Sequence, residues 1–163
     1  MPDILAFCKW LEQTPVGAGV RESVWLFPII ESLHLLGMAV LVGTIFMLDL
    51  RLLGWTMRRV RVSALAGWLF PWTWAGLIVQ VITGAVLFSS EAAKLYPNPA
   101  FRLKLILIGA AGIHALLFHR LVYRDVAAWN DSAELPMGAK IAGLISIVLW
   151  AGIVTAGRFI GFV

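Results

Sequence analysis

The chain has 163 residues, of which 61% are hydrophobic and only 13% are charged, and its formal net charge is +4. A soluble domain of this size is usually nearer half apolar and a quarter charged, so the composition excludes a soluble catalytic module and indicates one integral membrane domain. The basic residues lie in loops between apolar runs, as membrane topology requires, and we therefore expect no nucleic-acid partner. The sole cysteine, Cys8, excludes an internal disulfide and a cysteine-based metal cluster.

Residues 1–23 are expected to form an amphipathic segment at the membrane surface. A helix over residues 3–13 places most of its apolar side chains on one face, which is typical of an interfacial helix; these are Ile4, Leu5, Phe7, Cys8 and Leu11. The stretch from Thr14-Pro15 to Gly19 is expected to end this helix. The segment lacks a basic start and is interrupted by Lys9 and Glu12, so we do not expect a cleavable signal.

The sequence of residues 24–163 predicts an all-α, integral membrane four-helix bundle. Four apolar runs provide the ~20 residues that a ~30 Å hydrocarbon core requires. Continuous rather than alternating apolar runs exclude a β-barrel. The polar groups inside the second run are Gln80 and Thr83. The four predicted spans cover residues 24–48, 69–88, 103–121 and 140–162.

The orientation is predicted from the arginines that connect the first two spans. Residues 51–61 hold four arginines, whereas the whole-chain count of basic residues is nearly even between the two sides. The positive-inside rule places this connection in the cytoplasm and both termini outside a bacterial-type inner membrane. Trp68, Trp72 and Trp74 crowd the same entrance of the second span, as an interfacial aromatic belt does.

His34 and His114 are two of only three histidines, and each lies inside a predicted span. An ionisable group in a bilayer is costly, so such a residue indicates a functional site. By helix rise, His34 lies ~13–15 Å and His114 ~16 Å below the outer starts of the first and third spans. Because these spans run in the same direction, we expect both rings at one depth, where they can ligate one haem iron. A hydrogen bond across a helix interface and a different metal are the alternatives.

Charged and sulfur-containing residues surround this pair. Glu31 and Met38 lie one turn from His34 on the same face, and Glu31 is a candidate to carry protons, bind a quinone or pair with a cation. Lys104 and Arg158 lie near the outer ends of the third and fourth spans. They are candidates to pair with haem propionates, the alternative being that they extend to the interface.

Two segments resemble a known family. Leu33-His34-Leu35-Leu36-Gly37 leads to Asp49-Leu50-Arg51, and Phe101-Arg102-Leu103-Lys104-Leu105 is followed by His114 and Arg120. Both resemble helices of HemJ-type protoporphyrinogen oxidases, in a group of four-helix membrane proteins that includes the CopD-like copper proteins. This resemblance covers two of the four helices, and the chain lacks the Pro-Arg ending of the first HemJ helix. It implies haem b in the bundle and quinone-linked redox work, with His34 and Lys104 at the positions of functional residues.

The sequence therefore predicts a b-type haem protein that works with a membrane quinone and a redox partner protein, either in electron transfer or as a quinone-linked oxidoreductase. Haem b is expected between the first and third spans, with His34 and His114 as metal ligands and with Lys104 and Arg158 binding the cofactor. The alternatives are a porphyrin redox enzyme, a copper transporter using His34, Met38 and Met47, and a non-catalytic anchor subunit. We expect the chain to be embedded in the lipid bilayer, and a homo-oligomer is a further option for its assembly.

Overall fold

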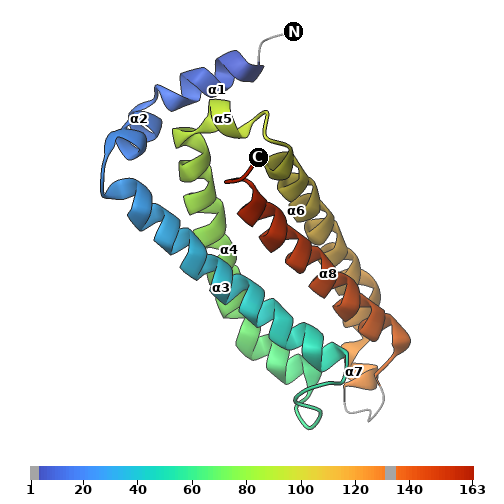
Figure 1. The fold of residues 1–163 in the computed structure, drawn as a ribbon. Coiled ribbons are helices and arrows are strands. Elements are labelled where there is room, and N and C mark those ends of the chain that lie inside the picture. Colours follow the sequence, from blue (N-terminus) through green and yellow to red (C-terminus); the bar gives the residue numbers. More distant parts are fainter. Residues whose placement is uncertain (1–3, 131–134) are drawn as a thin grey trace.

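Four long helices form the body of the molecule (Figure 1). The structure is a computed structural model that describes residues 4–130 and 135–163. Each of the four helices is long and apolar enough to cross a membrane, which confirms the predicted all-α, four-span fold. They are α3 (Leu26–Leu52), α4 (Val62–Ser90), α6 (Pro99–Leu117) and α8 (Met137–Phe159).

The helices begin and end at residues different from those predicted. The start of α4 lies seven residues before the expected residue 69, because Val62, Leu65 and Ala66 are buried in the core and continue the helix beyond its most apolar part. The start of α6 is fixed by Asn98, whose side chain accepts a hydrogen bond from Phe101 N at 3.0 Å. Pro99 follows in the first turn, where proline needs no N–H partner.

The third span continues past α6 toward the next connection. A π-helical turn, η1 (Phe118–Val122), is followed by a 3₁₀ turn, η2 (Tyr123–Asp125), and by α7 (Val126–Trp129). The side chains of Phe118 and Tyr123 pack on the hydrophobic core that α3, α4 and α8 form at this end of the bundle. The core therefore joins all four long segments at one end.

The bundle consists of two antiparallel hairpins, α3 with α4 and α6 with α8 (Figure 1). Glycine permits a close approach of the two backbones within the first hairpin: a Cβ atom on Gly76 would lie 2.9 Å from Leu41 N. The second hairpin meets the first where α8 packs on α3. There a Cβ atom on Gly143 would lie 3.1 Å from Asp49 O. Small residues at such crossings let membrane helices pack closely.

The N-terminal segment contains two helices, α1 (Ile4–Glu12) and α2 (Pro15–Glu22). The first helix ends before Thr14, as expected, but the second helix that begins at Pro15 was not predicted. Thr14 caps α2 by accepting a hydrogen bond from Gly17 N at 3.2 Å, and Pro15 occupies the first turn, a strong helix-start combination. Cys8 is buried, whereas Phe7 and Trp10 are exposed.

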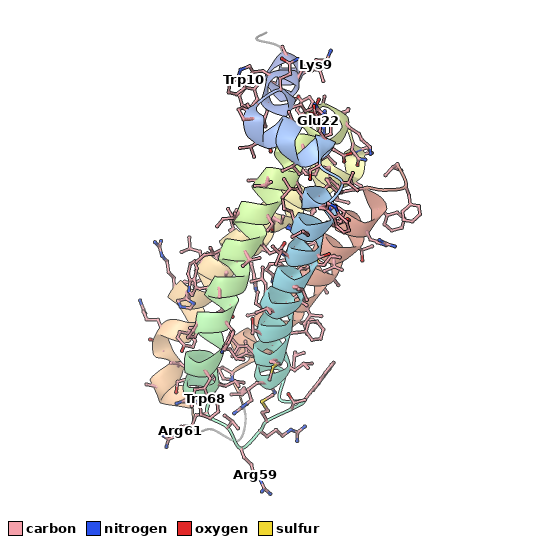
Figure 2. The ribbon with its side chains drawn as sticks, turned by 90° about the vertical axis from the view of Figure 1, so that its left-hand side faces the viewer. Lys9, Trp10, Glu22, Arg59, Arg61 and Trp68 are labelled. Carbon is pink, nitrogen blue, oxygen red and sulfur yellow. The ribbon has the colours of Figure 1, made fainter. Side chains whose placement is uncertain are left out.

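The two ends of the bundle carry different elements. Both N-terminal helices and α5 (Ala92–Leu95) lie at the end where α4 finishes and where the C-terminus lies (Figure 1); we call this the terminal end. Figure 2 shows Arg59, Arg61 and Trp68 at the opposite end, which we call the arginine end. Gly17 anchors α2 at the terminal end, since a Cβ atom there would lie 2.6 Å from Ser89 O.

Candidate functional site

His34 is held by a threonine of the neighbouring helix. Its Nδ1 lies 2.8 Å from Thr83 Oγ1, and Thr83 Oγ1 lies 2.6 Å from Val79 O. A carbonyl oxygen only accepts, so the threonine hydroxyl donates its proton to Val79 and accepts from His34 Nδ1–H. In the neutral ring the unprotonated nitrogen is then Nε2. This is the arrangement of a metal-ligating histidine, in which one nitrogen is free and the other N–H is held by a fixed acceptor.

Two more residues of α4 fix the position of the histidine. The Gln80 amide donates to His34 O across the helix interface. Gly84 leaves space for the imidazole, because a Cβ atom there would lie 3.3 Å from His34 Cε1. Gln80, Thr83 and Gly84 follow the three- and four-residue spacing of one helix face. One face of α4 therefore sets the backbone, the tautomer and the ring position of His34.

The positive charge of Lys104, on the second hairpin, is within electrostatic reach of this histidine. The half-buried side chain of Lys104 passes α8 at Gly157, where a Cβ atom would lie 3.5 Å from both Lys104 Cε and Nζ. The structure thus brings together two of the four residues that were predicted to bind the cofactor, and we call His34, Gln80, Thr83 and Lys104 the His34 cluster.

His114 lies elsewhere and is bonded differently. Its Nε2 is 3.0 Å from Ala142 O on α8. Because the carbonyl accepts, Nε2 carries the proton and is occupied by the backbone. This is the hydrogen bond across a helix interface that the sequence analysis left open as the alternative to ligation. Only Nδ1 of the His114 ring is left without a described partner.

The two histidines lie at different depths in the bundle. Along α8, Ala142 beside His114 and Gly157 beside Lys104 are fifteen residues apart, a distance of ~22 Å along the helix. Along α3, His34 is fifteen residues from Asp49, which contacts α8 at Gly143, again ~22 Å. Both counts place His114 near the arginine end and His34 toward the terminal end. The expected equal depth is therefore wrong, and one iron does not reach both rings in this arrangement.

A comparison with family models assigns the chain to a group. The model of a family of unknown function, DUF6644, matches residues 7–163. The chain belongs to the DUF6644 family. No curated protein and no solved structure matches it. The HemJ and CopD resemblance of this DUF6644 protein therefore rests on the short segments around His34 and Lys104 alone.

The other residues predicted to bind haem or copper in the DUF6644 chain do not belong to the His34 cluster. Arg158 directly follows Gly157 and is exposed near the terminal end. Met38 lies one turn below His34, but Met47 is nine residues farther along α3, ~13 Å away along the axis. His34, Met38 and Met47 therefore do not surround one copper ion. Among the residues that the structure describes, no group of three or more His, Cys, Asp or Glu side chains is placed to hold a metal ion.

An apolar cavity of about 630 Å³ lies between α6 and α8 in this DUF6644 protein. Leu103, Leu107, Thr155 and Phe159 are among its lining residues, and His34 and Lys104 are not. The cavity is therefore separate from the His34 cluster.

The roles of Gln80, Thr83 and Asp49 were missed from the sequence. Gln80 and Thr83 were recognised only as polar residues of the second span, because the sequence does not show which face of α4 meets His34. Asp49 lies one residue beyond the predicted first span, but it is only 4% exposed near the end of α3. A histidine in one span and a Gln-x-x-Thr pair in the next was the available signal.

Proposed function

We propose that this DUF6644 protein binds haem b in the membrane through His34 as a single histidine ligand, and that it transfers electrons between a membrane quinone and a redox partner. The observation that carries the proposal is the hydrogen bond from His34 Nδ1 to Thr83 Oγ1, because it leaves Nε2 free in a fixed ring. His114 also keeps one ring nitrogen, Nδ1, without a described partner, so it is the positive charge of Lys104 near His34 that favours His34 as the haem ligand.

The donor set around His34 fits a haem. The Nε2 lone pair is the iron ligand, and the Lys104 ammonium group is the cation for a propionate carboxylate. Gly84 has no side chain beside the imidazole. A bound haem b supplies one-electron chemistry at a potential set by axial ligation, burial and nearby charge.

The protein side chains have separate tasks in this proposal. Thr83 holds the Nδ1 proton, so that the ring keeps the ligating tautomer. Gln80 ties the His34 backbone to α4. Lys104 neutralises one carboxylate in this proposal, and Arg158, which is exposed near the terminal end, pairs with a second. His114 joins α6 to α8 and is not a ligand.

The proximity of Lys104 to His34 also favours a second candidate, a porphyrin redox enzyme. A lysine beside the ligand would hold a substrate carboxylate as readily as a haem propionate. HemJ-type proteins, which the chain resembles, have functional residues at the same two positions. Oxidation of protoporphyrinogen by the purified protein supports the enzyme, and a haem spectrum without this activity supports the electron carrier.

The proposed orientation places the arginine end in the cytoplasm. Arg58 and Arg59 are exposed at this end, and Trp55 and Trp68 are exposed beside them. Cytoplasmic connections are rich in arginine and lysine, and tryptophans gather at the interface. The His34 cluster then lies in the outer half of an inner membrane.

An absorption spectrum of the purified protein tests the proposal directly. After expression with ample haem, the wild-type protein is expected to show a Soret band that shifts on reduction, together with α and β bands. A purified, folded protein without any of these bands contradicts haem binding.

The Thr83→Val variant is expected to bind haem ~10–100-fold more weakly, as is typical when the group that orients a ligating histidine is lost. Valine has nearly the shape of threonine but does not accept the Nδ1 proton. Titration of the haem-free protein with haem gives the Kd. Thr73→Val is the matched control, because Thr73 bonds to Thr44 on the same two helices at 2.9 Å. Equal affinities of the two variants would contradict a role for Thr83.

A further inference from the structure

Asp49 is a buried carboxyl group without a full set of partners. It lies three residues before the end of α3 and is 4% exposed. Among the described residues, its Oδ2 is the one buried side-chain nitrogen or oxygen that has no hydrogen-bond partner. Buried polar groups are nearly always paired, so an orphaned oxygen needs an explanation.

The packing of α8 encloses this carboxyl group. The backbone of α8 approaches Asp49 at Gly143, where a Cβ atom would lie 3.1 Å from Asp49 O and 3.6 Å from its Cα. One turn along α8, the Ser146 hydroxyl interacts with the carboxyl group. Ala142 O, which belongs to the same turn of α8, accepts the hydrogen bond from His114. Asp49 of the first hairpin and His114 of the second therefore contact the same turn of α8.

No cation neutralises Asp49 among the described residues. Arg51, two residues away, directs its Nε to Val60 O at 2.8 Å and its Nη2 to Arg58 O at 3.4 Å. Helix α4 has no ionisable side chain. None of the ionisable residues on the other helices that pack against α3 forms an ion pair with Asp49; these are Arg21 and Glu22 on α2 and Lys140 and Arg158 on α8.

We propose that Asp49 is a proton-binding site of the membrane domain, neutral in the packed bundle and able to exchange its proton at the arginine end. An ionised carboxylate with an unpaired oxygen away from water costs far more free energy than the neutral acid. The site lies within one turn of the end of α3, so a proton has only a short path to the aqueous connection. This function does not depend on haem.

Infrared difference spectra of the full-length protein in lipid vesicles, recorded between acidic and alkaline pH, test the proposal. The wild-type protein is expected to show a protonated-carboxyl C=O band that is lost at high pH. Aspartate labelled with ¹³C at the side-chain carboxyl shifts this band, which separates it from any band of Glu31 in the same helix. The band is expected to disappear in Asp49→Asn and to change frequency in Ser146→Ala.

Two controls make the result decisive. Glu31→Gln and Asp125→Asn, which alter an exposed carboxyl group on α3 and one outside the core, should leave the aspartate band intact. Asp49→Asn replaces a neutral acid by a neutral amide and should unfold at nearly the wild-type temperature. Absence of an aspartate band in the wild-type protein, or its persistence in Asp49→Asn, overturns the proposal. If Asp49→Asn does not fold, the labelled wild-type and Ser146→Ala spectra decide.

Discussion

Replacing His34 with alanine is expected to abolish the haem absorption spectrum of the purified protein, whereas replacing His114 with alanine is expected to preserve it. The difference follows from the surroundings of the two rings. His34 is held by Thr83 and is within reach of the positive charge of Lys104. His114 is instead bonded to Ala142 O of α8 at a different depth. The two variants remove the same side chain from two membrane helices and are therefore matched.

The outcomes separate the candidate ligand sets. Loss of the spectrum in both variants, with both proteins folded, would restore the bis-histidine site expected from the sequence and would contradict the depth difference seen here. Retention in His34→Ala would remove His34 as the ligand. Addition of free imidazole to His34→Ala should restore a Soret band, because the small base replaces the missing ligand, and this rescue is not expected from a purely structural histidine.

Gly76→Ala is expected to lower the stability of the protein by ~1–3 kcal/mol, the usual cost of overpacking, and to weaken haem binding. The added Cβ atom would lie 2.9 Å from Leu41 N and 3.1 Å from Gly37 O. Both are backbone atoms of a neighbouring helix and do not move without separating α3 from α4. Such a separation also disturbs the contact between His34 and Thr83, two turns away along the same interface.

Gly67→Ala is the matched control for the packing prediction. It lies on the same helix, and a Cβ atom there would have no neighbour within 4 Å. Removing a helical glycine at an open position gains up to ~1 kcal/mol from helix propensity. Unfolding in mixed detergent micelles measures both variants. An equal change in the two would show that helix propensity, rather than the crossing of α3 and α4, determines the effect.

The sequence predicted the four spans because a run of apolar residues is a direct signal of a membrane helix. The depth predicted for the histidines in the membrane was wrong, because a helix can begin at polar residues outside the apolar run. With predicted starts at residues 24 and 103, His34 and His114 lie ten and eleven residues inside. With the observed starts at Leu26 and Pro99 they lie eight and fifteen residues inside.

The sequence also did not show which helices pack against one another. Apolar side chains cover all faces of a membrane helix, so the pattern does not show which face meets which neighbour. The expectation placed haem between the two histidine helices. In the structure the main helix contacts are between helices that follow one another in the chain, α3 with α4 and α6 with α8, as short connections favour. Lys104, not His114, is consequently the residue of α6 that acts on His34.

The close packing of α8 on α3 at Gly143 has a mechanical consequence. The hydrophobic core and this contact join the two hairpins at the arginine end, while the His34 cluster lies ~22 Å away along the helices. A small rotation of one hairpin about Gly143 would therefore move Lys104 relative to His34 more than it would move Ser146 relative to Asp49. The proposed haem site and the proposed proton site are thus expected to respond differently to a movement between the two hairpins.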